Sequence, residues 1–483
     1  MPMTSRLNKG SDDLSRKLRW ILDRDRLSRR RFLVGTAVLG GGLLAGSFVG
    51  CDDGDDGGEQ TPVGASPTTV SGPAQGASLD VMMAAHTGFY RLAGQDFERA
   101  NNATLNYTVE QFGLMPTLLT PAFEAGGHSW DVVYIWRAWV EQYRQFLTPL
   151  DELGLEVSDS DLRWEALEAS RSLDGKFYGL PSNIYTYVLY GNKTRLAEAG
   201  VDELPTRYSD FVDLCRELTG GGKLGYSDGW APLYLQPKWN VWLHLNGGQL
   251  YSDDEVGDVL FDSPEAMQAT QDMSDLLAFM PSESPTSPWG IYDVEAKKLF
   301  FNETAAMIID YQHIWYEAQD PDVSAVGEGN VLVGLVPGGK AGGPESAGQS
   351  VGECFAIPRT SNKKEAALEL VKFYSSPAAQ LGLFTRRSDV FQFDPADESG
   401  YPSYKSLYDD PAIPEADRPN IDATLRQSEF VGFRYGTRPA YQAIADTIEA
   451  AVSSVLLGQK DVEAAHGEAQ SALDQIVSRE VLP

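Results

Sequence analysis

LDVMMAA at residues 79–85, FYRLAGQDFERA at 89–100, TLNYTVE at 104–110, LMPTLLTPAFEA at 114–125 and DVVYIW at 131–136 follow one another with only short breaks. The first, third and fifth segments are short runs typical of strands, whereas the second and fourth have the length and apolar spacing of helices. Strands that alternate with single helices form parallel βαβ units with right-handed crossovers. The stretch therefore predicts an α/β fold whose sheet begins parallel.

Later helices are marked by their start and stop signals. The Ser-Pro pairs at 263–264 and 376–377 each combine an N-cap residue with proline at the first helical position. An apolar stripe that starts at Tyr441 ends at Gly458, and Asp461 can cap a final helix that runs through Ile476. The chain is therefore expected to begin as α/β and to end almost entirely helical.

The first 50 residues have the order of parts of an export signal. The run Ser28–Leu33 (SRRRFL) fits the twin-arginine pattern, which a receptor reads as an address. An apolar, glycine-diluted run follows, and Phe48-Val49-Gly50-Cys51 resembles a lipoprotein cleavage box, with Phe48 where that pattern has Leu. We expect residues 1–50 to be a signal peptide and Cys51 to be acylated, which would tether the protein to the outer face of the cell membrane. The alternative is an uncleaved transmembrane helix, which the glycines disfavour.

The next segment has the composition of a linker. Residues 51–78 consist almost entirely of Asp, Gly, Ser, Thr, Pro and Gln, and such a segment buries too little apolar surface to fold. Beyond it remain roughly 400 residues, which exceeds the size at which single cores stop growing. Two domains are therefore expected.

Net charge excludes some classes of partner. The 483-residue chain carries 39 basic and 69 acidic residues, a formal charge of −30. Nucleic acids and anionic lipid surfaces repel such a chain. Because the acidic residues are scattered rather than blocked, they favour an ordinary solvated surface.

Cysteine and histidine usage predicts neither a metal site nor a cofactor. The five histidines show no paired or Cys-x-x-Cys spacing that would suggest zinc. If Cys51 is acylated, one disulfide between Cys215 and Cys354 is possible, and the spacing does not decide whether it forms. A buried free thiol is the default for Cys215, which lies in an amphipathic stretch.

One motif mimics a catalytic site. The run Gly348–Gly352 (GQSVG) matches the nucleophile elbow of serine hydrolases, which requires a strand that turns into a helix. Here a glycine-rich loop leads into a strand-like segment, so the order is reversed and no catalytic residue is predicted. A secreted glycan hydrolase stays the alternative, because its carboxylate pair is defined by space and not by sequence spacing.

Aromatic residues gather at the ends of predicted strands and in loops, often beside planar polar groups. Sugar rings present apolar C–H faces and a rim of hydroxyls, and flat aromatic surfaces next to amides, acids and arginines suit both. Ordinary core packing explains many of these aromatics individually, so the inference rests on the set. Examples are Trp136-Arg137, Asn183 near Tyr185, Trp230, Asp310-Tyr311 and Phe433-Arg434.

Six weak motifs in the right order support a resemblance over Leu79 to Val477. The chain resembles the extracellular solute-binding proteins of ABC importers, of the maltose and multiple-sugar type. The motifs are DGKFYGLP at 174–181, LYGNK at 189–193, LNGG at 245–248, FDSPEA at 261–266, FNETAAM at 301–307 and the tail after Gly458.

The resemblance implies an α/β, two-lobed periplasmic-binding-protein fold that closes on its ligand like a clamshell. Lobe 1 would comprise residues 79–189 plus 355–395, and lobe 2 residues 190–354 plus 396–483. The interlobe crossings are expected near Val188–Gly191, Val351–Phe355 and residues 392–400. The implied function is capture of a mono- or oligosaccharide outside the cytoplasm and its delivery to the permease subunits of an ABC transporter, by a monomer without catalytic activity or cofactor.

The same resemblance assigns ligand-binding positions. They follow strand ends, the loop after Pro181, the segment after Met307 and the start of the helix at Tyr441. The expected ligand-binding residues are His86, Thr87, Trp136, Arg137, Asn183, Tyr185, Trp230, Asp310, Tyr311, His313, Glu353, Arg434 and Tyr441.

Two departures from the family pattern concern the ligand. Glu353 replaces an aromatic in a Gly-Gly-Trp-Gly hinge, and Asp310–His313 differs from the usual segment at that position. Both acids would suit a cation, so a polyamine is an alternative ligand within the same fold, as is a polyol.

Overall fold

The computed structural model describes residues 72–231, 234–252, 257–281, 293–386, 400–431 and 438–480. The predicted signal peptide, Cys51, most of the predicted linker and Arg434 lie outside these ranges. Within them the folded body already includes the end of the predicted linker, because Ser78 opens the first strand and Ala74 is buried.

The stretch that suggested the fold forms the expected units. Its elements are β1 (Ser78–Ala84), α2 (Tyr90–Asn101), β2 (Thr104–Glu110), α3 (Met115–Glu124) and β3 (Val132–Trp136). Strand β1 pairs in parallel with both β2 and β3. The prediction of parallel βαβ units is confirmed, with element bounds that differ by at most one residue from those expected.

One long strand carries the sheet from its first part to its second. The sheet order is β2-β1-β3-β8-β4-β6-β5, with β7 also on β4. Residues 179–186 of β4 pair with β8, and residues 187–192 pair with β6 and β7. The change of partner therefore falls at Thr186 and Tyr187, just before the crossing expected at Val188–Gly191. The strands are β4 (Gly179–Asn192), β5 (Leu224–Ser227), β6 (Ala305–Tyr311), β7 (Val331–Gly334) and β8 (Ser350–Ala356).

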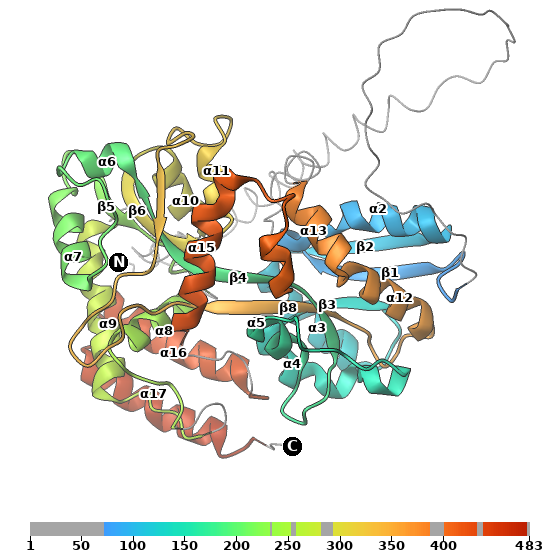
Figure 1. Ribbon diagram of the computed structural model, residues 1–483. Helices are drawn as coiled ribbons and strands as arrows, with labels where there is room; N and C mark the ends of the chain where they lie inside the picture. Colours follow the sequence, from blue (N-terminus) through green and yellow to red (C-terminus); the bar gives the residue numbers. More distant parts are fainter. Residues whose placement is uncertain are drawn as a thin grey trace, which may run out of the picture. The chain divides into compact units, whose positions relative to one another are not determined.

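Helices cover the two parts of the sheet separately. Around β1 and β2 lie α2, α12 (Lys364–Tyr374) and α13 (Pro377–Thr385), and α5 (Trp164–Ser170) packs on β8 (Figure 1). Beyond the β4 changeover, a group of four helices packs together, and α15 (Arg418–Gln427) lies along β4 and β7 (Figure 1). The four are α8 (Leu235–Leu245), α9 (Pro264–Leu276), α16 (Tyr441–Leu456) and α17 (Val462–Val477). The other α-helices among the described residues are α4 (Arg137–Tyr143), α6 (Lys193–Ala197), α7 (Tyr208–Glu217), α10 (Asp293–Phe301) and α11 (Ile314–Gln319).

The predicted helix caps are present. Ser263, Ser376 and Asp461 each accept a hydrogen bond from a backbone N–H in the first turn of the helix that follows. Gly458, two residues past the end of α16, has a φ of +64°, which glycine adopts without strain. The local sequence therefore fixes these helix ends.

Strand β3 and helix α8 are buried along their whole length. All five residues of β3 are buried, and every residue of α8 is buried as well, because neighbouring elements surround both. Cys215 and Cys354 are both buried and free, so no disulfide joins them. Burial raises the pKa of both thiols well above the usual value.

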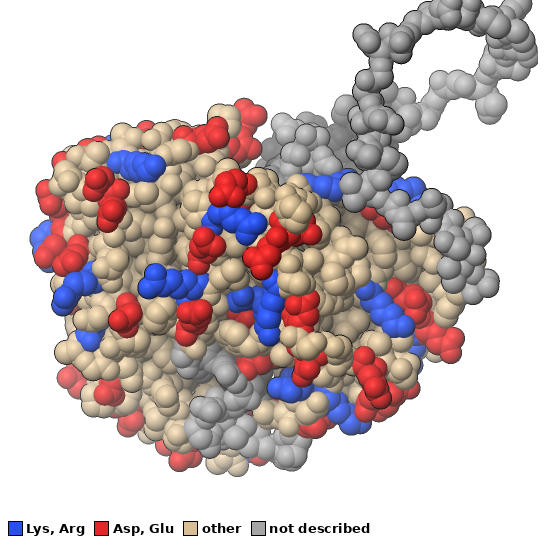
Figure 2. Space-filling view, in the orientation of Figure 1, with Lys and Arg blue, Asp and Glu red and all other residues tan. Residues whose placement is uncertain are grey.

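Surface charge follows the pattern expected from the sequence. Figure 2 shows acidic side chains interspersed with basic ones over the visible face, as in a solvated surface. Among the described residues, no helix is both long and apolar enough to cross a membrane.

Candidate functional site

Strand ends bring the first site residues together. His86 lies two residues past the end of β1, and Trp136 ends β3, two strands that are parallel neighbours. The carboxyl ends of parallel strands meet at one edge of a sheet, so both side chains lie on that edge. Glu353 joins them because β8 pairs with β3 in antiparallel register, which sets Glu353 opposite Trp136.

Glu353 is a buried carboxylate with three hydrogen-bond donors. Its Oε1 lies 2.8 Å from His86 Nε2 and also accepts from the Tyr134 hydroxyl. Its Oε2 accepts from Asn183 Nδ2 at 2.7 Å. Burial, followed by the charge of Glu353, raises the pKa of Tyr134 well above its usual value, so this phenol keeps its proton and stays a donor.

Aromatic rings extend from this carboxylate in one connected group, which we call the ring cluster. The His86 ring lies 5.6–5.7 Å from the rings of Phe112, Tyr134 and Tyr185. Phe112 in turn stacks on Trp139 with centroids 4.9 Å apart. The members of the ring cluster are His86, Phe112, Tyr134, Trp136, Trp139, Tyr185, Tyr187, Tyr311, His313 and Tyr441.

The ring cluster continues into the second part of the sheet. Tyr185 lies 5.4 Å from Tyr311 of β6, and Tyr311 stacks on Tyr187 at 4.2 Å. Below Tyr187, the Lys238 ammonium sits 3.9 Å from the ring centroid and forms an ion pair with Asp228 at 2.7 Å. This buried pair supports the ring cluster from beneath.

A separate contact ties the first part of the sheet to the C-terminal helices. The Trp136 ring lies 5.7 Å from the ring of Tyr441, the first residue of α16. The Tyr441 hydroxyl donates to Gln236 Oε1 of α8 at 3.1 Å. Three segments that are far apart in the sequence therefore meet at one edge of the ring cluster.

Several polar atoms at the ring cluster are buried but have no hydrogen-bond partner among the described residues. They are Asn183 Oδ1, Trp139 Nε1 and Gln349 Oε1. Gln349 belongs to this site because its Nε2 donates to the Tyr311 hydroxyl at 3.1 Å. Buried polar groups are normally satisfied, so two acceptors and one donor left over at one site suggest partners supplied from outside.

Eight of the expected ligand-binding residues meet at this site. These are His86, Trp136, Asn183, Tyr185, Tyr311, His313, Glu353 and Tyr441.

The other four expected residues within the described ranges are all buried. Thr87 is fully buried and its hydroxyl donates to Ala84 O. Arg137 forms a buried ion pair with Glu168 at 2.7 Å, and Trp230 is fully buried. Asp310 is 1% exposed and accepts from the backbone N–H of Tyr311.

Sequence reasoning missed four members of the ring cluster as ligand-binding candidates: Phe112, Tyr134, Trp139 and Tyr187. Tyr134 carried a usable signal, because it lies two residues before Trp136 and strand alternation sets both on one face. Trp139 lies three residues after Trp136, and Tyr187 lies two residues after Tyr185, so each carried a similar signal. Phe112 lies in a short 3₁₀ helix and offered no local signal.

The serine of the GQSVG motif has no catalytic surroundings. Ser350 is buried at the start of β8, where its hydroxyl contacts Glu165 and Thr186. His466, the histidine that follows the motif in the sequence, contacts Thr270 and the backbone oxygen of Phe261. The expectation that a strand follows the motif is confirmed.

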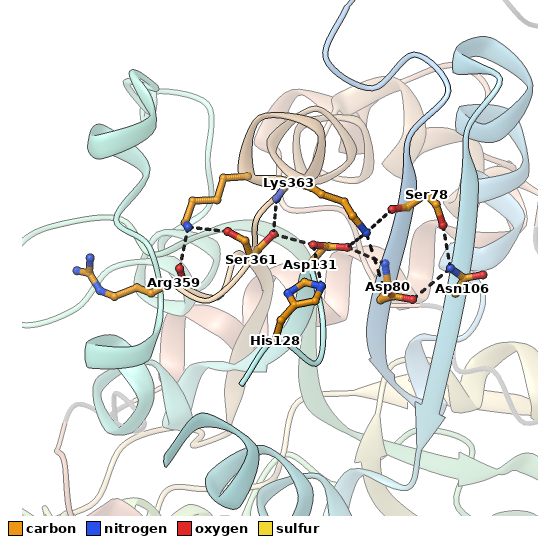
Figure 3. A network of polar contacts seen from close by, with 9 residues as sticks. Ser78, Asp80, Asn106, His128, Asp131, Arg359, Ser361 and Lys363 are labelled. Carbon is orange, nitrogen blue, oxygen red and sulfur yellow. Dashed lines mark hydrogen bonds and ion pairs between the residues drawn. The ribbon is translucent and has the colours of Figure 1, made fainter. Parts of the chain in front are cut away.

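A second polar group lies at the opposite ends of the strands. Asp80, His128 and Asp131 each offer one ligand-type atom, all within 4.8 Å of one another (Figure 3). Lys363 already supplies positive charge there, 3.1 Å from Asp131 and 3.9 Å from Asp80. Burial alone would raise the pKa of Asp131, but hydrogen bonds from Ser361, the Asp80 N–H and Lys363 lower it. We therefore interpret the group as a structural ion-pair network, next to a hollow of about 740 Å³ that Ser78 and Ser361 help to line.

Comparison with known proteins gives one family match. The family described as "Bacterial extracellular solute-binding protein" matches residues 83–381. An arabinooligosaccharide-binding protein of Halalkalibacterium halodurans is 24% identical over 342 residues, which is 65% of this chain and 72% of that protein.

Two solved structures are similar over most of the chain. An ABC transporter solute-binding protein from Agrobacterium radiobacter, in complex with ribitol, has a TM-score of 0.70 at 21% identity and covers 84% of this chain and 100% of its own. The maltose-bound MalE3 of T. maritima has a TM-score of 0.70 at 21% identity, with 83% and 100% covered. At this identity the likeness establishes a shared fold.

Proposed function

Because the chain belongs to the family of bacterial extracellular solute-binding proteins, we propose that it captures a carbohydrate outside the cytoplasm and delivers it to an ABC importer. The family is one of binding proteins rather than enzymes, and its members act outside the cytoplasm. The resemblance inferred from six short motifs is confirmed, as is the α/β, two-lobed periplasmic-binding fold.

The ring cluster around Glu353 is the observation that carries the carbohydrate proposal. Aromatic faces suit the C–H faces of a sugar ring, and hydrogen-bonding groups at their margins suit its hydroxyls. Asn183 Oδ1 and Gln349 Oε1 are unsatisfied acceptors, while Trp139 Nε1 is an unsatisfied donor. A hydroxyl group both donates and accepts, so it can serve either kind of atom.

The ligands of the similar proteins agree with this chemistry. They are an arabinooligosaccharide, ribitol and maltose, which are all polyhydroxylated and uncharged. Ribitol keeps a polyol as an alternative to a sugar. No observation favours the other alternative, a glycan hydrolase, because the Glu353 carboxylate at the ring cluster already accepts hydrogen bonds from three donors.

Ligand entry would require the rings to separate. Trp136 is 8% exposed and Tyr441 is 4% exposed, so each ring is covered by its neighbours. The contact between them joins segments from different parts of the fold, and a hinge motion at β4 and β8 would part them. Closure would then be stabilised only by a ligand with higher affinity for the closed state.

Export and tethering form the finer part of the proposal. Arg29-Arg30 and the apolar run after them would direct export, and acylated Cys51 would hold the protein at the outer face of the membrane. A tether raises the effective concentration of the binding protein near its permease without any new contact. In this proposal the protein acts as a monomer, and the lipid is its only attachment to the membrane.

The decisive experiment is isothermal titration of the full-length protein with arabinotriose, maltotriose, ribitol and mannitol. We expect one of them to bind with 1:1 stoichiometry and to be recovered unchanged. At a hundred times its Kd the bound ligand should add about 2.7 kcal/mol to the free energy of unfolding. Release of shorter sugars would identify a hydrolase, and binding of none of the four would contradict the proposed ligand class.

A further inference from the structure

Glu353 lies in the ring cluster, yet its charge is not directed at a ligand. We propose that Glu353 is a positioning residue: it orients the Asn183 amide and the His86 ring, and so makes the site selective for neutral, hydroxyl-bearing ligands over cations. This inference rests on the proposed function, because it names how the same site chooses its ligand class.

The first step is the occupancy of the carboxylate. Glu353 is 3% exposed, and three donors from three elements already take up its oxygens: His86, Tyr134 and Asn183. A carboxylate has about four acceptor positions in all. A polyamine would need such a group as its counter-ion, and little of this one is left to offer.

The second step concerns the His86 ring. An ionised carboxylate only accepts hydrogen bonds, so the contact of 2.8 Å requires that Nε2 of His86 carries the hydrogen. Three rings then surround the imidazole edge-on, those of Phe112, Tyr134 and Tyr185. Glu353 therefore sets both the orientation of the ring and the nitrogen that is protonated.

The third step concerns the Asn183 amide. Because its Nδ2 donates to Glu353, its Oδ1 must be the atom turned away, and this oxygen is buried without a partner among the described residues. Gly400 packs so closely that an added Cβ there would come within 2.5 Å of Asn183 Cβ, which restricts the side chain. An unsatisfied acceptor held in a fixed orientation is matched by a hydroxyl donor.

The substitution Glu353→Gln keeps the size of the side chain but changes the hydrogen bonds by which it orients His86 and Asn183. The new amide must turn its NH₂ group either toward His86 and Tyr134 or toward Asn183, and in each case a donor faces a donor. If it faces Asn183, that amide must rotate and present Nδ2 where Oδ1 was. Either arrangement disturbs one of the two groups that Glu353 positions.

The test compares the full-length wild-type protein with E353Q, using maltotriose, ribitol and spermidine as probes in titration calorimetry. We expect no spermidine binding by the wild type, and at least a ten-fold loss of affinity in E353Q for the neutral probe that binds. The ¹⁵N signals of the His86 ring should show hydrogen on Nε2 in the wild type and change in E353Q. Glu369→Gln, at a half-exposed position on α12 outside the ring cluster, serves as the matched control and should change nothing.

A second variant covers the case in which E353Q does not fold. Asn183→Ala removes the oriented acceptor but keeps the contact between Glu353 and His86, so it should weaken the neutral probe while leaving the His86 ¹⁵N signals unchanged. Spermidine binding by the wild type, or normal affinity of Asn183→Ala, would overturn the proposal. The NMR measurement needs no ligand, so an absence of sugar binding would contradict the proposed function while the positioning role is still decided.

Discussion

The ring of Trp136 packs edge-on against the ring of Tyr441, with their centroids 5.7 Å apart. Trp136 ends a strand of the N-terminal βαβ units, and Tyr441 begins a helix near the C-terminus. Both rings are predicted ligand-binding residues, and their meeting marks one margin of the ring cluster. The first of four predictions concerns this contact.

Loss of either ring should weaken carbohydrate binding without unfolding the protein. Trp136→Ala or Tyr441→Ala removes an aromatic contact whose burial contributes of the order of 1.5–3 kcal/mol to the binding free energy. This loss corresponds to about a ten- to hundred-fold higher Kd. Titration calorimetry with the probe that the wild type binds measures this change. Trp130→Ala, a tryptophan whose indole contacts Thr108 outside the ring cluster, is the control and should bind normally. Unchanged affinity in both ring variants would place the ligand elsewhere.

The ion pair beneath Tyr187 should matter for stability. Burial raises the pKa of Asp228 while the Lys238 ammonium opposes that effect, so Lys238→Met leaves an uncompensated buried acid. Breaking such a pair costs about 3–5 kcal/mol, and the double variant with Asp228→Asn should recover much of the loss.

Urea unfolding measures both effects. Lys372→Met removes a half-exposed pair with Glu369 and should cost less than about 1 kcal/mol. A single variant as stable as the wild type would show that the buried pair contributes nothing.

Acid should destabilise the protein partly through His244. Burial lowers the pKa of this histidine from 6.5 to about 4. Above pH 6.5 it is neutral whether the chain is folded or unfolded. Between pH 6.5 and 4 only the unfolded chain takes up the proton. The free energy of unfolding therefore decreases as the pH is lowered, by at most about 1.4 kcal/mol per pH unit and about 3 kcal/mol in all.

Replacement by a residue that does not titrate isolates this contribution. Urea unfolding of His244→Leu at several pH values should give a shallower loss of stability than the wild type over the same range. The remaining slope belongs to other groups, among them His466, whose pKa burial also lowers. Equal slopes for the two proteins would contradict the assignment.

Cell fractionation tests the tether. In a bacterial host, Cys51→Ser should move the protein from the membrane fraction to the soluble extracytoplasmic fraction, because the acyl chains would be absent. Arg29→Lys together with Arg30→Lys should leave the uncleaved chain inside the cell. Cys354→Ala, which alters a buried thiol, should stay with the membrane. Membrane association that survives in Cys51→Ser would favour the uncleaved transmembrane helix.

The local sequence determined much of the fold. The segments from residue 79 to 136 contain their own strand and helix periods, and Ser263, Ser376 and Asp461 form their caps with neighbours three residues away. These features depend on contacts within one or two turns, which is why the pattern alone predicts them. The order of six short motifs was sufficient to indicate the family.

The site was decided only by the tertiary structure. Glu353 meets His86 across 267 residues and Asn183 across 170, and no spacing in the sequence specifies these distances. The register of β8 against β3 and β4 sets them, and that register is specified because β3 and β8 are buried along their whole length. The sequence thus predicted eight of the residues that meet at the ring cluster, whereas the pairing of distant strands determined which donors hold the Glu353 carboxylate.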